Sequence, residues 1–245
     1  MQEPKERARP KRRKRAKPRS VKKLNKEEIE TIKDMLENPK RSETGRKIDA
    51  RYDDVVDYHI LNLVDYLGPS FYRMGLSPNV FTTLSLIFAL ASGYFLRNRA
   101  YAIAGSCWFI NYFFDSIDGN FARRYNMMSQ FGDWYDHVTD YIGYALVCYS
   151  MIVACDDLAV ALTLIIVLTA GVGLACFHAK NEYNGQVARH PGTGGSMSAL
   201  SYLPSIDASI TRTYGLGMNC LLTSLVFAFL PQIEVLLAHK LFISC

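Results

Sequence analysis

Apolar residues are grouped along this chain into long stretches, and a polar region precedes them. Residues 1–53 are strongly polar, whereas most of residues 54–245 are apolar or aromatic. An α-helix needs about 20 apolar residues to cross a hydrocarbon core of about 30 Å. The stretches predict spans at about residues 77–96, 100–121, 132–154, 158–179, 214–230 and 233–243. We therefore expect an all-α, multi-pass integral membrane protein with six transmembrane helices, or five if the short last stretch does not span.

A separate helix is predicted between the polar region and the first span. Between residues 55 and 67, apolar side chains recur at helical spacing and polar ones can face the other way. This pattern indicates an amphipathic helix on the membrane surface, with a soluble helix packed on a partner as the alternative. Gly68 and Pro69 are expected to end it. The chain thus divides into a tail (1–53), an interfacial helix (54–76) and a transmembrane domain (77–245).

The tail is basic and is expected to be largely disordered, apart from one short helix after Asn25. Its first 23 residues hold twelve Lys or Arg, and the net charge of +5 is concentrated there. No apolar segment follows this start, so it is not a secretory signal. Basic segments favour the cytoplasmic side and attract anionic lipids, so the tail and the loops at 122–131 and 180–212 are expected to face the cytoplasm. In a eukaryotic cell the expected location is the endoplasmic reticulum membrane.

Nucleic-acid binding or a nuclear address is the alternative role for the basic run. The run lacks interleaved aromatic residues and a nucleic-acid-binding fold, so no nucleic acid is expected as a partner. The six cysteines include no C-x-x-C pair and lie mostly in apolar stretches, where Cys acts as a small apolar residue; a disulfide or zinc site is the alternative.

Carboxylates lie at the facing ends of the second and third predicted spans. Asp115 and Asp118 are three residues apart and Asp136 and Asp140 are four apart, so each pair shares one face of its helix. Carboxylates at membrane depth are costly and usually functional. Two facing helices would bring all four carboxylates into one small volume, where a bound multivalent cation would offset their mutual repulsion. Oxygen ligands suit Mg²⁺ or Mn²⁺, and two ions would offset the charge of the acids and of a pyrophosphate.

Small residues and one cation lie between these acids. Gly119, Ala122 and Gly132 would leave room for a ligand close to the backbone, and Arg123 suits a phosphate oxygen. Together with bound metal, this set predicts a site for a nucleotide diphosphate. Asp133 is an additional acid that is expected to face elsewhere.

The whole pattern resembles the signature of the CDP-alcohol phosphatidyltransferase family. D-x-x-D-G-x-x-A-R-x8-G-x-x-x-D-x-x-x-D is complete from Asp115 to Asp140. The resemblance implies transfer of a phospho-group from a CDP-linked donor to an alcohol acceptor, at least one of them a lipid, with release of CMP. It implies that two divalent metals are bound by Asp115, Asp118 and Asp136, with Asp140 also at the metal site and acting as general base. It further implies that the small residues and the arginine, Gly119, Ala122, Arg123 and Gly132, line the CDP site, and that the protein is a homodimer.

The alcohol is less well defined. His137 directly after Asp136 is similar to the choline/ethanolamine phosphotransferase branch, and so is the Ser-Pro-Asn start of the first span. Thr139 before Asp140 is closer to the phosphatidylinositol synthases. We favour the aminoalcohol branch, with an inositol-type synthase as the alternative. The candidates for an anionic head group, which could equally be ordinary loop charges, are Lys180, Arg189, His190 and Arg212, whereas His178 is expected to be a packed interfacial histidine.

A cation transporter or channel is the rival class. Acids on facing helices within the membrane would serve it equally well. That class gives no reason for Gly119, Ala122, Arg123 and Gly132 at their positions, so the enzyme is the favoured interpretation.

Overall fold

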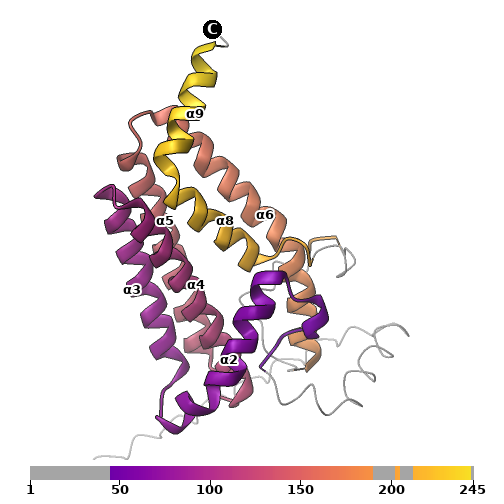
Figure 1. Ribbon diagram of the computed structural model, residues 1–245. Coiled ribbons are helices and arrows are strands. Elements are labelled where there is room, and N and C mark those ends of the chain that lie inside the picture. The colour runs from indigo at the N-terminus through magenta and orange to yellow at the C-terminus, as the bar shows by residue number, and fades with distance from the viewer. Residues whose placement is uncertain (1–44, 190–201, 205–211, 244–245) are drawn as a thin grey trace, which may run out of the picture.

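The computed structural model describes residues 45–189, 202–204 and 212–243. In that part the chain is helical, with seven α-helices and one 3₁₀ turn, and no strand. Figure 1 shows α9 (Leu230–Ile243) at one end of the bundle and α2 (Val55–Arg73) near the opposite end. The all-α prediction is confirmed. The predicted helix after Asn25 lies outside the described residues.

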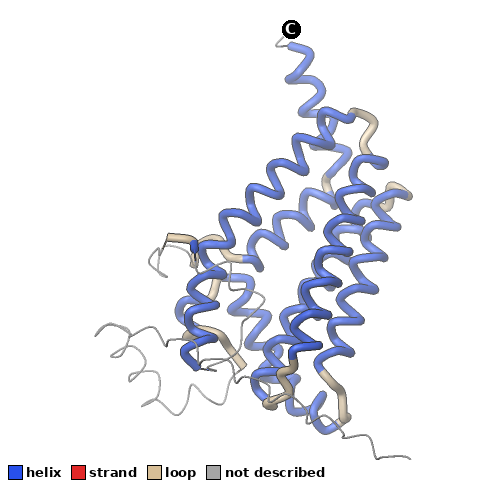
Figure 2. Tube along the Cα trace, turned by 180° about the vertical axis from the view of Figure 1, so that it is seen from behind, coloured by secondary structure: helices blue, strands red, loops and turns tan. Residues whose placement is uncertain are grey.

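Three long helices form one side of the bundle. These are α3 (Pro78–Arg97), α4 (Tyr101–Arg124) and α5 (Gln130–Ala154), and they lie side by side in both views (Figures 1 and 2). Pro78 occupies the first turn of α3, where its missing N–H costs nothing. Ser129 caps α5 by accepting a hydrogen bond from the backbone N–H of Gly132. Arg99, with φ of 61°, turns the chain between α3 and α4.

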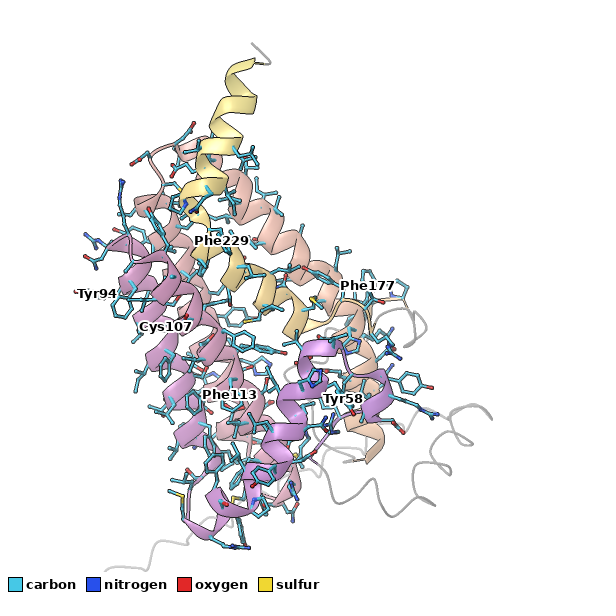
Figure 3. The ribbon with its side chains drawn as sticks, in the orientation of Figure 1. Tyr58, Tyr94, Cys107, Phe113, Phe177 and Phe229 are labelled. Carbon is cyan, nitrogen blue, oxygen red and sulfur yellow. The ribbon has the colours of Figure 1, made fainter. Side chains whose placement is uncertain are left out.

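The remaining helices complete the bundle. They are α6 (Leu158–Arg189), α8 (Leu216–Ala228) and α9 (Leu230–Ile243). The chain bends by 78° between α8 and the first part of α9. Phe229 lies at this bend (Figure 3). α8 packs mainly against α4, so it covers the face of α4 that α3 leaves open.

Six spans are not confirmed. Among the described residues, Pro78–Arg97 and Leu158–Glu182 are long and apolar enough to cross a membrane, and the bent α8–α9 pair could be a third span. α4 and α5 have 24 and 25 residues, which is sufficient length, but both carry several charged side chains. α8 and α9 have only 13 and 14 residues, so neither crosses a bilayer unaided.

The helix that precedes α3 is not interrupted at Gly68 and Pro69. α2 (Val55–Arg73) continues through Gly68 and Pro69, so the expectation that they end the helix is wrong. Pro69 has no N–H to donate to the carbonyl of Asp65. The guanidinium of Arg124 donates to that carbonyl instead, at 2.9 Å. A side chain of α4 thereby provides the hydrogen bond that the Asp65 carbonyl cannot receive from Pro69.

Helix α6 exceeds its expected length. It continues from Leu158 to Arg189, so residues 180–189, which were expected to belong to a loop, are helical. Its last turns carry polar groups that other segments satisfy: Glu182 is paired with Lys47, and Lys180 donates to the carbonyl of Leu203. Contacts distant in sequence therefore sustain a helix where the composition predicts a loop.

Apolar side chains form two clusters in the bundle. One joins α3, α5, α6 and the α8–α9 bend, and includes Leu96, Val147 and Phe227. The other packs α2 against α3 and α4, through residues such as Ile60, Phe81 and Phe121. The second cluster lies at the end of α4 that carries Asp118, so it helps to hold that end of α4 against α2 and α3.

Candidate active site

Three of the predicted acids meet between α4 and α5. Asp115, Asp118 and Asp136 each offer a carboxylate oxygen, and these oxygens lie within 4.8 Å of one another. Asp118 is buried and the other two are half-buried. Three carboxylates this close repel one another unless a cation is shared among them. The arrangement therefore could bind a metal ion with hard oxygen ligands.

The polar surroundings of the three acids fit such an ion. Oδ1 of Asp136 is buried and accepts no hydrogen bond, so it is available as a ligand atom. Oδ2 of Asp118 instead accepts a hydrogen bond from the buried hydroxyl of Thr82 on α3. A hydrogen bond of this kind orients a ligating carboxylate. The residues present thus suit a divalent cation that prefers oxygen ligands.

Asp140 lies close to this group but faces a different space. Its carboxyl is adjacent to that of Asp115. It does not line the polar cavity of the three acids and lines a second cavity, which Asp115 also reaches. The four acids are therefore neighbours, with Asp115 between the two spaces.

The polar cavity has a volume of about 440 Å³. All four non-acidic residues of the motif line it: Gly119, Ala122, Arg123 and Gly132. Asp133, which was expected to face elsewhere, lines it too, and that expectation is wrong. A cavity of this size is suitable for a nucleotide.

Gly119 has a more specific effect than general access to the backbone. A Cβ at this position would lie 3.1 Å from Nη1 of Arg123. The missing side chain therefore makes room for the guanidinium one turn later in the same helix. Nε of Arg123 donates to the carbonyl of Gly45 at 2.6 Å. The motif arginine is thus held by the segment that precedes the helices.

That segment contributes residues that the sequence interpretation missed. Lys47 and Asp53 line the polar cavity, as do Asp57 of α2 and Glu182 of α6. Burial raises the pKa of Asp53 to about 7, although the nearby Arg46 guanidinium opposes the shift. Burial, with the Asp54 and Glu182 carboxylates close by, raises the pKa of Asp57 well above its usual range. No motif marks these residues, because they reach the cavity only through the fold.

The second cavity is mainly apolar and has a volume of about 370 Å³. It lies between α4, α5, α6 and α8, with Asp115 and Asp140 in its wall. Its apolar lining includes Trp108, Val147, Leu168 and Phe227. An apolar space with two carboxylates in its wall suits a molecule with a hydrocarbon part and one reactive polar group.

The two described head-group candidates, Lys180 and Arg212, do not line the polar cavity. Lys180 is buried and donates to the carbonyl of Leu203, and Arg212 donates to the carbonyl of Arg51. His178 is buried, 3.8 Å from Glu182, which agrees with the expected packed histidine. His190 and the side chain of Arg189 lie outside the described residues.

Comparison with known proteins found one family. A family model described as CDP-alcohol phosphatidyltransferase matches residues 75–241, which is more than half of the chain's 245 residues. The match includes α3 to α8 and the whole motif from Asp115 to Asp140. No curated protein and no solved structure matches the chain.

Proposed function

Because the chain belongs to the CDP-alcohol phosphatidyltransferase family, we propose that its polar cavity binds the CDP-linked donor and that Asp115, Asp118 and Asp136 hold divalent metal beside the donor diphosphate. The protein is an integral membrane transferase of phospholipid synthesis, and its family is metal-dependent. The observation that carries the proposal is the meeting of three carboxylates in the wall of a cavity of nucleotide size.

The residues around the acids have distinct proposed roles. Bound Mg²⁺ or Mn²⁺, in two ions, would polarise the transferred phosphate and neutralise the charge that develops on the leaving CMP. Gly119, Ala122, Arg123 and Gly132 line the space proposed for the CDP part. Asp140 takes the proton of the acceptor hydroxyl as its oxygen bonds to phosphorus and the bond from phosphorus to CMP breaks. Its place next to Asp115, in the wall of the other cavity, supports this division.

The apolar cavity is the proposed site of a lipid substrate. Its lining accepts a hydrocarbon chain, and its carboxylates lie where a hydroxyl would react. This supports a lipid alcohol as acceptor and a small head group on the donor, as in the choline/ethanolamine phosphotransferase branch. A phosphatidylinositol synthase of the same family, in which the donor carries the lipid, is the alternative. In that alternative the polar cavity would still bind the CDP part of the donor, and the apolar cavity would hold the donor's hydrocarbon part.

Release of CMP tests the function directly. The purified full-length protein is given a panel of CDP-linked donors and alcohol acceptors, with Mg²⁺ or Mn²⁺ present. We expect CMP release that Asp140→Asn abolishes and that chelation of divalent metal stops. Asp156→Asn is the matched control, because Asp156 is exposed and pairs with Arg99 at the other end of the bundle. Transport of divalent cations across the membrane of vesicles that contain the protein, without CMP release, would instead favour a transporter.

The remaining expectations concern the setting of the enzyme. We propose that the polar cavity faces the cytoplasm and that, in eukaryotes, the protein lies in the endoplasmic reticulum membrane. We also propose that the chain forms a homodimer. Residues 1–23 are proposed to attract anionic lipids. Deletion of residues 1–23 should leave CMP release intact and weaken binding to anionic vesicles. Loss of turnover in a correctly inserted deletion variant would contradict the lipid-binding role.

A further inference from the structure

The polar cavity is completed by a segment that lies before the family match. We call residues 45–54 the N-terminal strap; the family match begins at residue 75. The strap contributes Lys47 and Asp53 to the cavity lining. These two residues therefore lie outside the segment that the family match covers.

The strap is fixed at both ends. Arg46 is buried, forms an ion pair with Asp53, and lies 3.3 Å from Asp65 and 2.8 Å from Oδ1 of Asn62, both on α2. At the other end, Asp54 is fully buried and its carboxylate caps α2. Because both ends are held, the position of Lys47 between them is defined.

Lys47 meets helix α6 at the cavity wall. Its ammonium donates to Oε2 of Glu182 at 3.1 Å, and the two side chains are 23% and 13% exposed. Both residues line the polar cavity together with the three metal-binding candidates. The charge of Lys47 acts on Asp115 and Asp136, so the ammonium lies within electrostatic range of the acid cluster.

From this geometry we propose that Lys47 binds the diphosphate of the CDP-linked donor, and that Glu182 is a positioning residue that holds the ammonium at the cavity wall. The proposal rests on the proposed function and extends it to a residue outside the motif. An ammonium has three N–H donors, of which the described residues accept one, through Glu182. The other two can reach phosphate oxygens.

The charge of the cavity supports this role. Among the described residues that line it, Lys47 and Arg123 are the only lysine or arginine. Carboxylates from α2, α4, α5 and α6 surround the same space. Metal ions would offset the three clustered acids, and a diphosphate would add further negative charge that needs a cation. The strap supplies one directly in Lys47, and its Gly45 carbonyl holds the other, Arg123.

A purely structural role for the ion pair is the competing explanation. Lys47 and Glu182 are 135 residues apart, so the pair could serve only to clamp the strap to α6. Exchange of the two side chains separates these roles. In K47E/E182K the ion pair can re-form, but the ammonium is then on α6 instead of the strap.

The experiment uses full-length protein in detergent or nanodiscs. CMP release gives kcat and the KM values of donor and acceptor, titration of CDP in the presence of Mg²⁺ gives a Kd, and thermal unfolding gives Tm. We expect Lys47→Gln to raise the donor KM and the Kd for CDP by about 10-fold to 100-fold, the usual effect of losing a charged hydrogen bond. The acceptor KM should not change, and Lys47→Arg should recover part of the donor affinity. Glu182→Gln should have a smaller effect in the same direction.

The exchange variant and one control decide the outcome. K47E/E182K should recover the Tm lost in Lys47→Gln and leave the donor KM high. Arg51→Gln, which removes one positive charge from an exposed position of the same strap, should change neither value. Recovery of the donor KM together with Tm in K47E/E182K, or an unchanged donor KM in Lys47→Gln, would overturn the proposal. If the wild-type protein binds CDP but releases no CMP, the proposed transferase function is contradicted, and the Kd for CDP still tests the role of Lys47. If the wild-type protein binds no CDP, both the transferase function and the role of Lys47 are contradicted.

Discussion

The hydroxyl of Thr82 on α3 donates a hydrogen bond of 2.5 Å to Oδ2 of Asp118 on α4. Both residues are buried, at 3% and 4% exposure, so water does not compete for this bond. Since Asp118 is one of the three clustered acids, helix α3 takes part in orienting them although it carries no acid itself. The spacing of the acids along the chain gives no indication of this third helix.

Replacement of Thr82 by valine tests that contact. The volume is conserved but the hydroxyl is lost, so Asp118 keeps its place without its orienting bond. Partners of this kind typically alter metal affinity by about 10-fold to 100-fold. We expect Thr82→Val to shift the Mg²⁺ concentration for half-maximal CMP release upward by about 10-fold, with little change in maximal rate at saturating metal. Thr163→Val is the control, since the exposed hydroxyl of Thr163 bonds only within its own helix, to the carbonyl of Ala159. An equal shift in both variants would contradict a specific role for Thr82.

The raised pKa of Asp53 predicts how stability depends on pH. Burial raises this pKa from 3.8 in the unfolded chain to about 7 in the folded protein, so the folded state binds more protons within that interval. Stability therefore falls as pH rises from about 4 to about 7, and this contribution is constant above that range. We expect the unfolding temperature of the wild type to decrease between pH 5 and pH 7.5, and Asp53→Asn to show a smaller decrease because the amide does not titrate. Parallel curves for the two proteins would show that another group is responsible.

The helices of the catalytic bundle could largely be predicted from the sequence. The first three predicted spans differ from α3, α4 and α5 by no more than three residues at either end. Local signals suffice there: Pro78 marks a helix start, and the short polar run at Arg97 permits only a tight turn. The meeting of Asp115, Asp118 and Asp136 also follows from local spacing, once α4 and α5, which both pack against α3, face each other.

The strap could not be predicted in the same way. Residues 40–53 are polar and lack any apolar period, so nothing local distinguishes them from the rest of the tail. The described residues of the strap are placed by partners distant in sequence, such as Glu182 for Lys47 and Arg123 for the Gly45 carbonyl. The presence of Pro69 inside α2 has the same explanation. The proline is tolerated because Arg124, 59 residues from Asp65 in the sequence, donates a hydrogen bond to the Asp65 carbonyl.

The carboxylate of Asp54 contacts both α2 and α8, and two substitutions can separate what each contact contributes to stability. One carboxylate oxygen accepts the backbone N–H groups of Val56 and Asp57 and caps α2, and the other accepts that of Met218 in α8 at 3.3 Å. Asp54→Ala loses both contacts, and loss of the cap alone typically costs about 1 kcal/mol. Asp54→Asn keeps one acceptor for the cap and replaces the other by a donor. We expect both to lower Tm, with the alanine variant lower. Equal Tm for Asp54→Asn and wild type would show that the Met218 contact contributes nothing.

Two glycines of the bundle predict opposite responses to the same substitution. At Gly105 an added Cβ would lie 2.4 Å from the backbone oxygen of Ser224, because α4 and α8 approach closely there. At Gly173 on α6 an added Cβ would meet nothing within 4 Å. Alanine favours a helix over glycine by about 1 kcal/mol at either position. Overpacking typically costs about 1–3 kcal/mol, and backbone atoms cannot move aside as a flexible side chain can, so the clash prevails at Gly105.

We expect Gly105→Ala to lower the unfolding temperature and Gly173→Ala to leave it unchanged or raise it. Because α4 also carries Asp115, separation of α4 from α8 should reduce CMP release in Gly105→Ala as well. A Gly105→Ala protein as stable and active as the wild type would show that the two helices do not depend on this close approach.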